Sequence, residues 1–411
     1  MILGGIATMG FVDRIVVNVL VEPLKQEFAL SDTQVSLLGF AFAVLSILVG
    51  IAVSRFIERG RRLDFIAFGT LFWSLATAAC GIALSWPQLL AARLGVGLGE
   101  AVGLPGNQSV IADYFPRNRR GLAMSILLLA PPIGALIGFV GGGLIAQHYS
   151  WRWTFLIAAI PGLVLAAMAW LLVAEPPRGQ HDAGDAGEIP PFREVLRRLF
   201  ALGSARNLVI ASSLASASGF GLNYFFTSLM LRRFELNIGE AGLYAGIMAS
   251  LPAALSIVAT GWLGDRLGDK RPAAYALIPA ASLLIAGPLY AFAITRSELP
   301  ILLGVVAFSA LFQFGYIGIT FATIQNLMHP RMRASASAVL NAIYSVAGGI
   351  GPLVLGALSD AMAPRYGAGT GLAYAMALLA LLYVWAALHY LLAARHLRSD
   401  IAATTDLGRP D

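Results

Sequence analysis

The chain has 411 residues, of which 58% are hydrophobic and 12% charged, and its formal net charge is +6 at pH 7. Soluble domains carry about 25% charged residues, so this composition excludes an ordinary soluble domain and indicates a chain rich in membrane spans. A single cysteine excludes an intrachain disulfide and a cysteine-rich metal site. The sequence has no nucleotide-binding loop, zinc-protease motif or nucleophile elbow, which argues against an ATP-driven pump or a membrane enzyme.

Apolar stretches long enough to cross the bilayer recur along the chain, since about 20 such residues span about 30 Å of hydrocarbon. All should be helices, because an open strand edge leaves its backbone unsatisfied in lipid. The sequence therefore predicts an all-α membrane protein with twelve transmembrane helices. They are expected at about 2–22, 33–56, 63–85, 87–112, 121–146, 152–174, 207–231, 240–264, 273–295, 299–325, 334–359 and 370–394. Small residues at helical spacing, such as Gly134, Gly138 and Gly142, favour close crossings between these helices.

A polar stretch separates six predicted spans from the other six. The expected domains are an N-terminal bundle over 1–174, a cytoplasmic linker over 175–206, a C-terminal bundle over 207–395 and a cytoplasmic tail over 396–411. Within the linker, the run from Pro191 to Phe200 places apolar residues on one side of a helix and arginines elsewhere. We expect a cationic amphipathic helix under the membrane there, with partner binding as the alternative.

The placement of positive charge predicts the orientation. If the N-terminus is cytoplasmic, few of the 28 lysines and arginines lie in external loops. Those few are Lys25, Arg152, Arg232, Arg233, Arg296 and Arg365. The positive-inside rule then puts both termini in the cytoplasm of a plasma-membrane or inner-membrane protein. The same bias accounts for the basic composition without nucleic acid as a partner.

Corresponding loops of the two halves resemble each other. Glu58-Arg59-Gly60-Arg61-Arg62, after the second span, is echoed after the eighth span by the run that contains Asp265-Arg266. Pro116-Arg-Asn-Arg after the fourth span is likewise echoed by Pro330-Arg-Met-Arg after the tenth. Parallel repeats of this kind are typical of transporters that rock one bundle against another around a midplane site.

These loops resemble the signature loop of the major facilitator superfamily, and further motifs resemble its spinster branch. The motifs are Asp13-Arg14, Leu30-Ser-Asp-Thr-Gln34, Trp73-Ser-Leu-Ala-Thr77, Arg93-Leu-Gly-Val-Gly-Leu-Gly-Glu100-Ala101, Ala112-Asp-Tyr-Phe-Pro116 and Glu175-Pro-Pro-Arg-Gly179. The resemblance implies two pseudo-symmetric six-helix bundles, with the first and fourth helices lining a central cavity. It also implies lipid substrates such as lysophospholipids or sphingosine phosphates. The first signature loop departs from the usual pattern with Ser54 in place of glycine and Glu58 in place of aspartate.

Four ionisable residues, Asp13, Arg14, Arg93 and Glu100, fall inside predicted spans. An ionised group at bilayer depth costs about 2.5–3.5 kcal/mol on insertion scales, so such groups are usually paired or functional. Arg93 and Glu100 are seven residues apart, which puts them on one helix face about 10 Å apart. We expect Glu100 and Asp13 to take and release a proton while Arg93 alternates between them and an anionic substrate group. The alternative is a static ion-pair network between the two helices.

Other candidate residues follow from position. Glu58, Arg59, Asp265 and Arg266, at cytoplasmic helix ends, are expected to close an inner gate, with solvated charge as the alternative. The expected substrate-binding residues are Arg14, Arg93, Asn223, Tyr224, Phe226, Gln313 and Tyr316. For the polar members of this set, interhelical hydrogen bonding is the alternative. The histidines are scattered, so no metal site is predicted.

The leading hypothesis is a monomeric, proton-coupled secondary transporter that works by alternating access on a lysolipid or another amphiphilic organic anion. A proton gradient would take the place of any cofactor. A broad-specificity exporter of drugs or organic anions is the first alternative. A non-transporting membrane receptor or sensor, and a passive lipid pathway, are alternatives from other classes.

Overall fold

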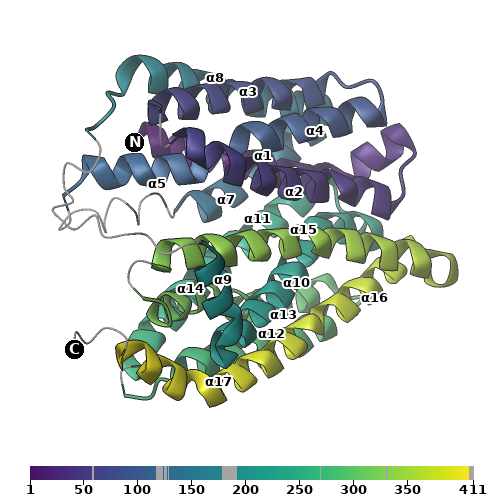
Figure 1. Cartoon of the computed structure of the whole chain (residues 1–411). Coiled ribbons are helices and arrows are strands. Elements are labelled where there is room, and N and C mark those ends of the chain that lie inside the picture. Colours follow the sequence, from purple (N-terminus) through teal and green to yellow (C-terminus); the bar gives the residue numbers. More distant parts are fainter. Residues whose placement is uncertain are drawn as a thin grey trace. The chain divides into compact units, whose positions relative to one another are not determined.

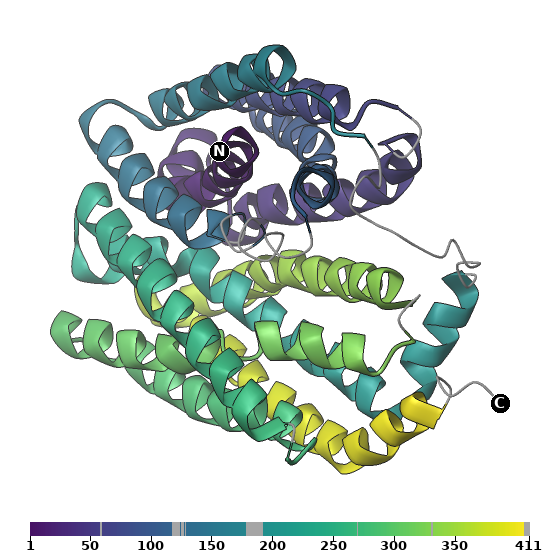
Figure 2. The ribbon, with the colours of Figure 1, turned by 90° about the vertical axis from the view of Figure 1, so that its left-hand side faces the viewer.

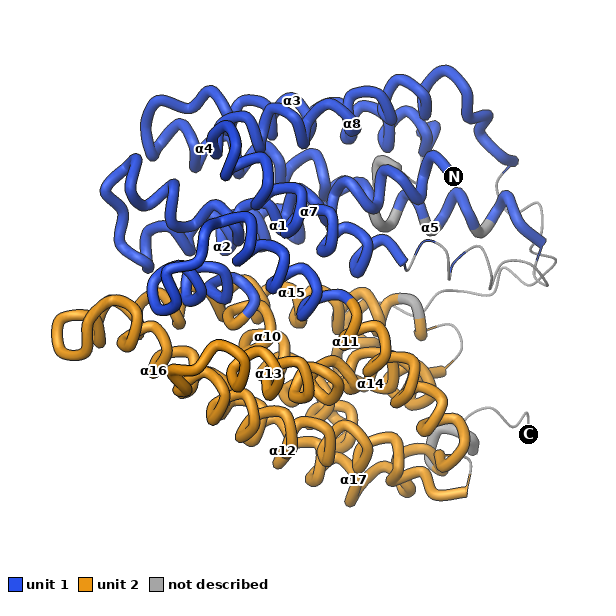
Figure 3. Tube along the Cα trace, turned by 180° about the vertical axis from the view of Figure 1, so that it is seen from behind, with its two compact units in different colours: residues 1–185, 223–250 blue, residues 186–222, 251–411 orange. Residues whose placement is uncertain are grey.

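The structure of the protein is a computed structural model (Figure 1). It describes residues 1–57, 60–116, 124, 127, 129–177, 192–268, 270–329 and 332–406. Every regular element in these ranges is a helix, which confirms the predicted all-α class. By its internal contacts the chain divides into two compact units (Figure 3). Unit 1 comprises residues 1–185 and 223–250, and unit 2 comprises residues 186–222 and 251–411.

The helices that begin in unit 1 are α1 (Ile2–Phe28), α2 (Asp32–Ile57), α3 (Arg62–Gly81), α4 (Trp86–Glu100), α5 (Gly103–Tyr114), α7 (Ala130–His148), α8 (Trp151–Leu172) and α11 (Ile238–Gly268). Those that begin in unit 2 are α9 (Phe192–Ala201), α10 (Gly203–Phe234), α12 (Ala274–Ile294), α13 (Leu299–Gln313), α14 (Ile317–Asn326), α15 (Arg333–Tyr366), α16 (Ala368–Ala380) and α17 (Leu382–Asp406). Helices α10 and α11 each contribute to both units. The four domain boundaries expected from the sequence stay predictions.

Eleven helical stretches among the described residues are long and apolar enough to cross a membrane. The fourth expected span is present too, but as two shorter helices, α4 and α5, with a break at Ala101 and Val102. Pro105 explains the break, because it has no amide hydrogen to donate to the carbonyl of Ala101 one turn back. Twelve spanning segments therefore match the predicted count, and Glu100 lies at the end of a helix rather than inside one.

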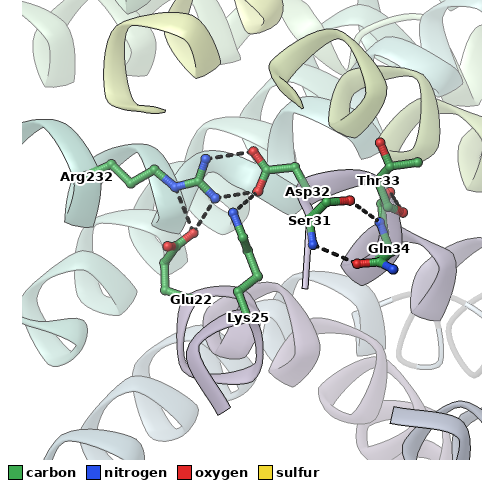
Figure 4. Close-up of polar contacts among 8 residues, drawn as sticks. Glu22, Lys25, Ser31, Asp32, Thr33, Gln34 and Arg232 are labelled. Carbon is green, nitrogen blue, oxygen red and sulfur yellow. Dashed lines mark hydrogen bonds and ion pairs between the residues drawn. The ribbon is translucent and has the colours of Figure 1, made fainter. Parts of the chain in front are cut away.

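Reciprocal caps fix where two of the helices begin. At the start of α2 the Ser31 amide donates to the Gln34 side-chain oxygen at 2.9 Å, and the Gln34 amide donates to the Ser31 hydroxyl at 3.2 Å (Figure 4). Asn237 and Glu240 make the corresponding exchange at the start of α11. Such capping boxes satisfy amides that the first turn of a helix leaves without partners.

Glycines let α1 and α7 approach closely within unit 1. A Cβ added to Gly134 would lie 2.5 Å from the Cβ of Phe11, and one added to Gly138 would lie 2.9 Å from the Cβ of Ile15. Both distances are too short for real side chains, so these two positions require glycine at the crossing. The predicted role of the small residues at 134 and 138 is confirmed. Elsewhere in this unit α3 packs against α8 and α4 (Figure 1).

Unit 2 is held together by pairs of buried polar side chains between helices. The amide of Gln313, at the end of α13, donates to the Tyr383 hydroxyl of α17 at 2.5 Å. Seven residues later in each segment, the hydroxyls of Thr320 on α14 and Tyr390 on α17 lie 2.6 Å apart. The two contacts flank Gly315, which lies between α13 and α14. They therefore hold both parts of this broken span against the same helix.

Candidate functional site

The candidate site lies in unit 1, where the charged residues of α1 and α4 meet. Asp13 is 2% exposed, Arg93 is 1% exposed and Glu100 is 6% exposed. None of the three therefore faces lipid or open solvent. Because a charge is costly away from water, each must be compensated by a neighbouring group of opposite charge, by hydrogen bonds or by a bound proton.

Arg14 and Glu100 form the ion pair of the site. The Nε of Arg14 donates to Oε2 of Glu100 at 2.8 Å. The Glu100 side chain is 3% exposed, whereas the Arg14 side chain is 40% exposed. One side chain of the pair is therefore buried inside unit 1, while the other is partly exposed.

Arg93 lies beside Asp13, one of the two acids between which it was expected to alternate. Its Nη1 donates to the backbone oxygen of Asp13 at 3.3 Å, and no carboxylate salt bridge of Arg93 is found in the described part of the chain. The expected alternation of Arg93 between Asp13, Glu100 and substrate stays a prediction, and in the structure Arg14 is the residue that pairs with Glu100. The seven-residue spacing of Arg93 and Glu100 gave no information about α1, where Arg14 projects toward Glu100.

Phe42 of α2 is a member of the site that sequence reasoning missed. The guanidinium carbon of Arg14 lies 5.0 Å from the centre of the Phe42 ring, and that of Arg93 lies 5.3 Å from it. Cation–π contacts of this kind contribute about 0.5–2 kcal/mol each, depending on how well the cation is shielded from water. Phe42 therefore positions both arginines. No sequence signal distinguished it from the other phenylalanines of the spans.

Several buried polar atoms of the site make no hydrogen bond. They are Oδ1 of Asp13, Oε1 of Glu100, Nε of Arg93 and the hydroxyl of Thr77 on α3. The Thr77 hydroxyl lies near the Asp13 carboxyl but outside hydrogen-bond geometry. Buried polar groups are nearly always satisfied, so a cluster of incompletely satisfied ones indicates a place where a proton, water or ligand group binds.

The residues expected to contact substrate are placed in both units. In unit 1, Tyr224 and Phe226 of α10 are each 4% exposed, and the Tyr224 hydroxyl donates to the Val35 carbonyl at 2.8 Å. In unit 2, Gln313 is held by its hydrogen bond to α17, and Tyr316 is 3% exposed. Tyr224 and Gln313 thus make the interhelical hydrogen bonds that were the alternative interpretation. Asn223 lies beside Tyr224 on α10.

The gating residues are only partly described. Glu58 and Arg59 lie outside the described residues. Asp265 and Arg266 are exposed near the end of α11, where the Arg266 guanidinium stacks over Trp262 with its carbon 5.2 Å from the ring centre.

A charged cluster that the sequence analysis did not single out gathers at the beginning of α3. Arg62 binds the carboxylates of Asp113 and Glu175, the latter at 2.7 Å, and donates to the Pro176 carbonyl at 3.0 Å. Asp113 and Glu175 both belong to motifs named in the sequence analysis. The motifs therefore pointed to these residues, but not to their shared contact with Arg62. The cluster joins α3, the end of α5 and the segment after α8.

A second cluster was also missed (Figure 4). Arg232 of α10 binds Glu22 of α1 at 2.6 Å and Asp32 of α2 at 2.5 Å, and Lys25 also binds Asp32. The Arg232 side chain is only 8% exposed. The charges of two acids and two bases compensate each other here, so the role of this cluster is to link α1, α2 and α10.

Comparison with known proteins places this architecture in a family. The profile of the Major Facilitator Superfamily matches residues 2–352. The chain belongs to this superfamily. A crystal structure of a bacterial homologue of the human lysosomal transporter spinster, inward-facing and unoccupied, superposes with a TM-score of 0.88 at 28% identity over 97% of each chain.

Two relatives extend the comparison. The chain is 30% identical to an MFS-type efflux pump of Mycolicibacterium smegmatis, over 97% of this chain and 93% of that one. It is 27% identical to the sphingosine-1-phosphate transporter SPNS2 of Mus musculus, over 52% of this chain and 39% of that protein. The protein is thus a multi-pass membrane transporter of the spinster type, and not an enzyme.

Proposed function

We propose that the protein is a proton-coupled secondary transporter that moves a lysolipid or another amphiphilic organic anion by alternating access. The observation that carries this proposal is the buried, incompletely satisfied set formed by Asp13, Arg93 and Glu100, with the partly exposed Arg14 paired to Glu100. A purely structural ion pair would satisfy its acceptor oxygens, because each unsatisfied buried acceptor costs about 1–3 kcal/mol. Two carboxylates that each retain an unused oxygen are suited to accept a proton.

The geometry suggests a division of labour between the two arginines. Arg14 holds Glu100 and is 40% exposed, so its guanidinium can exchange the carboxylate for an anionic group of the substrate. Protonation of Glu100 would weaken its bond to Arg14 and release the guanidinium for that exchange. Arg93 is buried and bonded to the α1 backbone, so its role is to position α1 and to compensate Asp13 electrostatically.

Proton coupling is tested by flux into proteoliposomes with and without an inward proton gradient. Glu100→Gln keeps the size and hydrogen-bonding capacity of the side chain but cannot cycle a proton. We expect it to abolish the stimulation by the gradient while the folded yield is kept. Glu27→Gln, an exposed carboxylate paired with Arg152, is the matched control and should transport normally. Gradient-driven transport that Glu100→Gln leaves unchanged would remove Glu100 from the coupling mechanism.

Substrate class is tested by a thermal-shift screen that compares lysophospholipids with sugars, aromatic acids and cationic dyes. We expect lysophospholipids or similar amphiphilic anions to stabilise the protein. Arg14→Gln should reduce the stabilisation by a charged amphiphile more than that by a neutral analogue. Stabilisation by small soluble acids alone would refute the proposal that the substrate is an amphiphile. Equal losses of stabilisation for the charged and the neutral analogue would refute anion capture by Arg14.

A broad exporter of drugs or organic anions is the second candidate function. It is favoured by the similarity over nearly the whole length to the efflux pump of Mycolicibacterium smegmatis. Efflux of structurally unrelated dyes from cells that express the protein would support it. Specific stabilisation by lysophospholipids without dye efflux would exclude it.

The remaining features of the proposal concern topology and assembly. We propose a monomer with both termini in the cytoplasm of a plasma or inner membrane, with bundle boundaries as expected from the sequence. Glu58, Arg59, Asp265 and Arg266 would then stand at the inner gate. Labelling of single cysteines with membrane-impermeant and membrane-permeant reagents on intact cells tests the orientation. Labelling of the C-terminal tail by the impermeant reagent would show that the orientation is the reverse of the one proposed.

A further inference from the structure

The surface that the transport proposal leaves unexplained lies on α9, the short helix before α10. Val195 is 1% exposed and Leu199 is fully buried, so this side packs against unit 2, where α9 contacts α15. The Arg198 side chain also reaches the Leu327 carbonyl, just past the end of α14, at 3.5 Å. One side of α9 is thus fixed to the ends of two spanning helices.

The side of α9 that adjoins Val195 and Leu199 is exposed and carries both aromatic and cationic side chains. Phe192 is 59% exposed and Phe200 is 42% exposed. Arg193 and Arg197 are exposed next to them. At 3.6 residues per turn these four side chains fall within about 140° of the helix circumference. Aromatic rings and guanidinium groups therefore share one outward face.

Further positive charge continues from α9 along unit 2. The Asp400 carboxylate of α17 accepts from the amide and hydroxyl of Ser204 at 2.9 and 2.6 Å, which fixes α17 beside the beginning of α10 (Figure 2). The exposed basic residues around this junction are Arg206, Arg395 and Arg398. The acids nearby are Glu194 and Asp400, and the second is engaged in the cap.

We propose that the outward face of α9 docks on the anionic headgroups of the cytoplasmic leaflet, with Phe192 and Phe200 inserted between lipids. Charge complementarity selects this occupant, because arginines near an anionic membrane surface bind it and aromatic rings favour the interface. A cationic helix at the end of a spanning bundle also lies within reach of the leaflet. Since Arg198 and Leu199 fix α9 to unit 2, lipid binding would steady the ends of α14 and α15. Docking on the cytoplasmic leaflet rests on the proposed orientation of the termini but not on the identity of the transported substrate.

Hydrogen exchange on the full-length protein in vesicles tests the proposal. We expect the amides of 192–201 to exchange more slowly as phosphatidylglycerol replaces phosphatidylcholine. Each arginine should contribute about a fivefold change in lipid affinity. In Arg193→Gln/Arg197→Gln the docking equilibrium should therefore fall about 25-fold, so that most of the protection is lost at every phosphatidylglycerol content.

Arg296→Gln/Arg365→Gln removes the same charge from two other exposed positions and is the matched control. It should behave like the unaltered protein. Equal protection of α9 in neutral and anionic vesicles would overturn the proposal, as would identical titrations of the two double variants. Unfolding temperatures in detergent, compared for all three proteins, show whether a loss of protection reflects misfolding instead.

Discussion

The ion pair of Arg14 and Glu100 allows a quantitative test of the site. A hydrogen bond to a charged group contributes about 1.5–3 kcal/mol, and removal of one partner from a fully buried pair costs about 3–5 kcal/mol. Glu100 is buried but the Arg14 side chain is 40% exposed, so water partly compensates its loss. We therefore expect Arg14→Gln to lower the free energy of unfolding by about 2 kcal/mol, near the lower end of these ranges.

A double-mutant cycle separates this interaction from other effects of the substitutions. The free energy of unfolding is measured by SDS titration in mixed micelles for the unaltered protein, Arg14→Gln, Glu100→Gln and the double variant. Because Glu100→Gln removes the buried charge that Arg14 compensates, the double variant should be more stable than the sum of the single losses predicts. The coupling should reach about 1–2 kcal/mol. Additivity within about 0.5 kcal/mol would refute the pairing and the mechanism built on it.

Three further substitutions test other parts of unit 1. Phe42→Leu removes two cation–π contacts of at least about 0.5 kcal/mol each, so gradient-driven flux should fall about 5-fold or more with normal expression. Normal flux in proteoliposomes would show that the ring does not position the arginines. Gly138→Leu adds a side chain at a position where even its Cβ would lie 2.9 Å from Ile15, so the folded yield measured by size-exclusion chromatography should collapse. A monodisperse variant would contradict the crossing of α1 and α7. Arg62→Gln leaves two carboxylates without their shared partner and should lower the free energy of unfolding by about 3 kcal/mol. The control, Arg61→Gln at an exposed position, should change it by less than about 0.5 kcal/mol. Equal effects of the two substitutions would contradict the structural role of Arg62.

The spans were predictable because their signal is a sum over about 20 residues, which tolerates local exceptions. The break between α4 and α5 was missed for the opposite reason. Hydropathy continues unchanged through Ala101 and Val102, and only the absent amide hydrogen of Pro105 marks the break. The break matters for the site, because it makes Glu100 the last residue of α4.

The site was predicted by residue type but not by pairing. Burial of Asp13, Arg93 and Glu100 followed from their position inside apolar stretches, because ionisable groups there are rarely in contact with lipid. Which arginine meets Glu100 depends on the rotation of α1 about its own axis, and that is set by its packing on α7 through Gly134 and Gly138. Phe42 was not predictable at all, since its function arises from two contacts across different helices.

The proposed mechanism makes use of an uneven distribution of buried charge between the two units. Unit 1 holds Asp13, Arg93 and Glu100 below the surface, whereas unit 2 pairs neutral groups such as Gln313 with Tyr383. Neutral hydrogen bonds change little with protonation, so the pairs of unit 2 should persist through the transport cycle. An ion pair that loses its charge loses most of its attraction, and among the described residues a buried carboxylate paired with a partly exposed arginine occurs at Glu100 and Arg14 of unit 1. If the proposed proton coupling holds, proton binding would alter unit 1 more than unit 2, and one protonation event would change the affinity for the substrate.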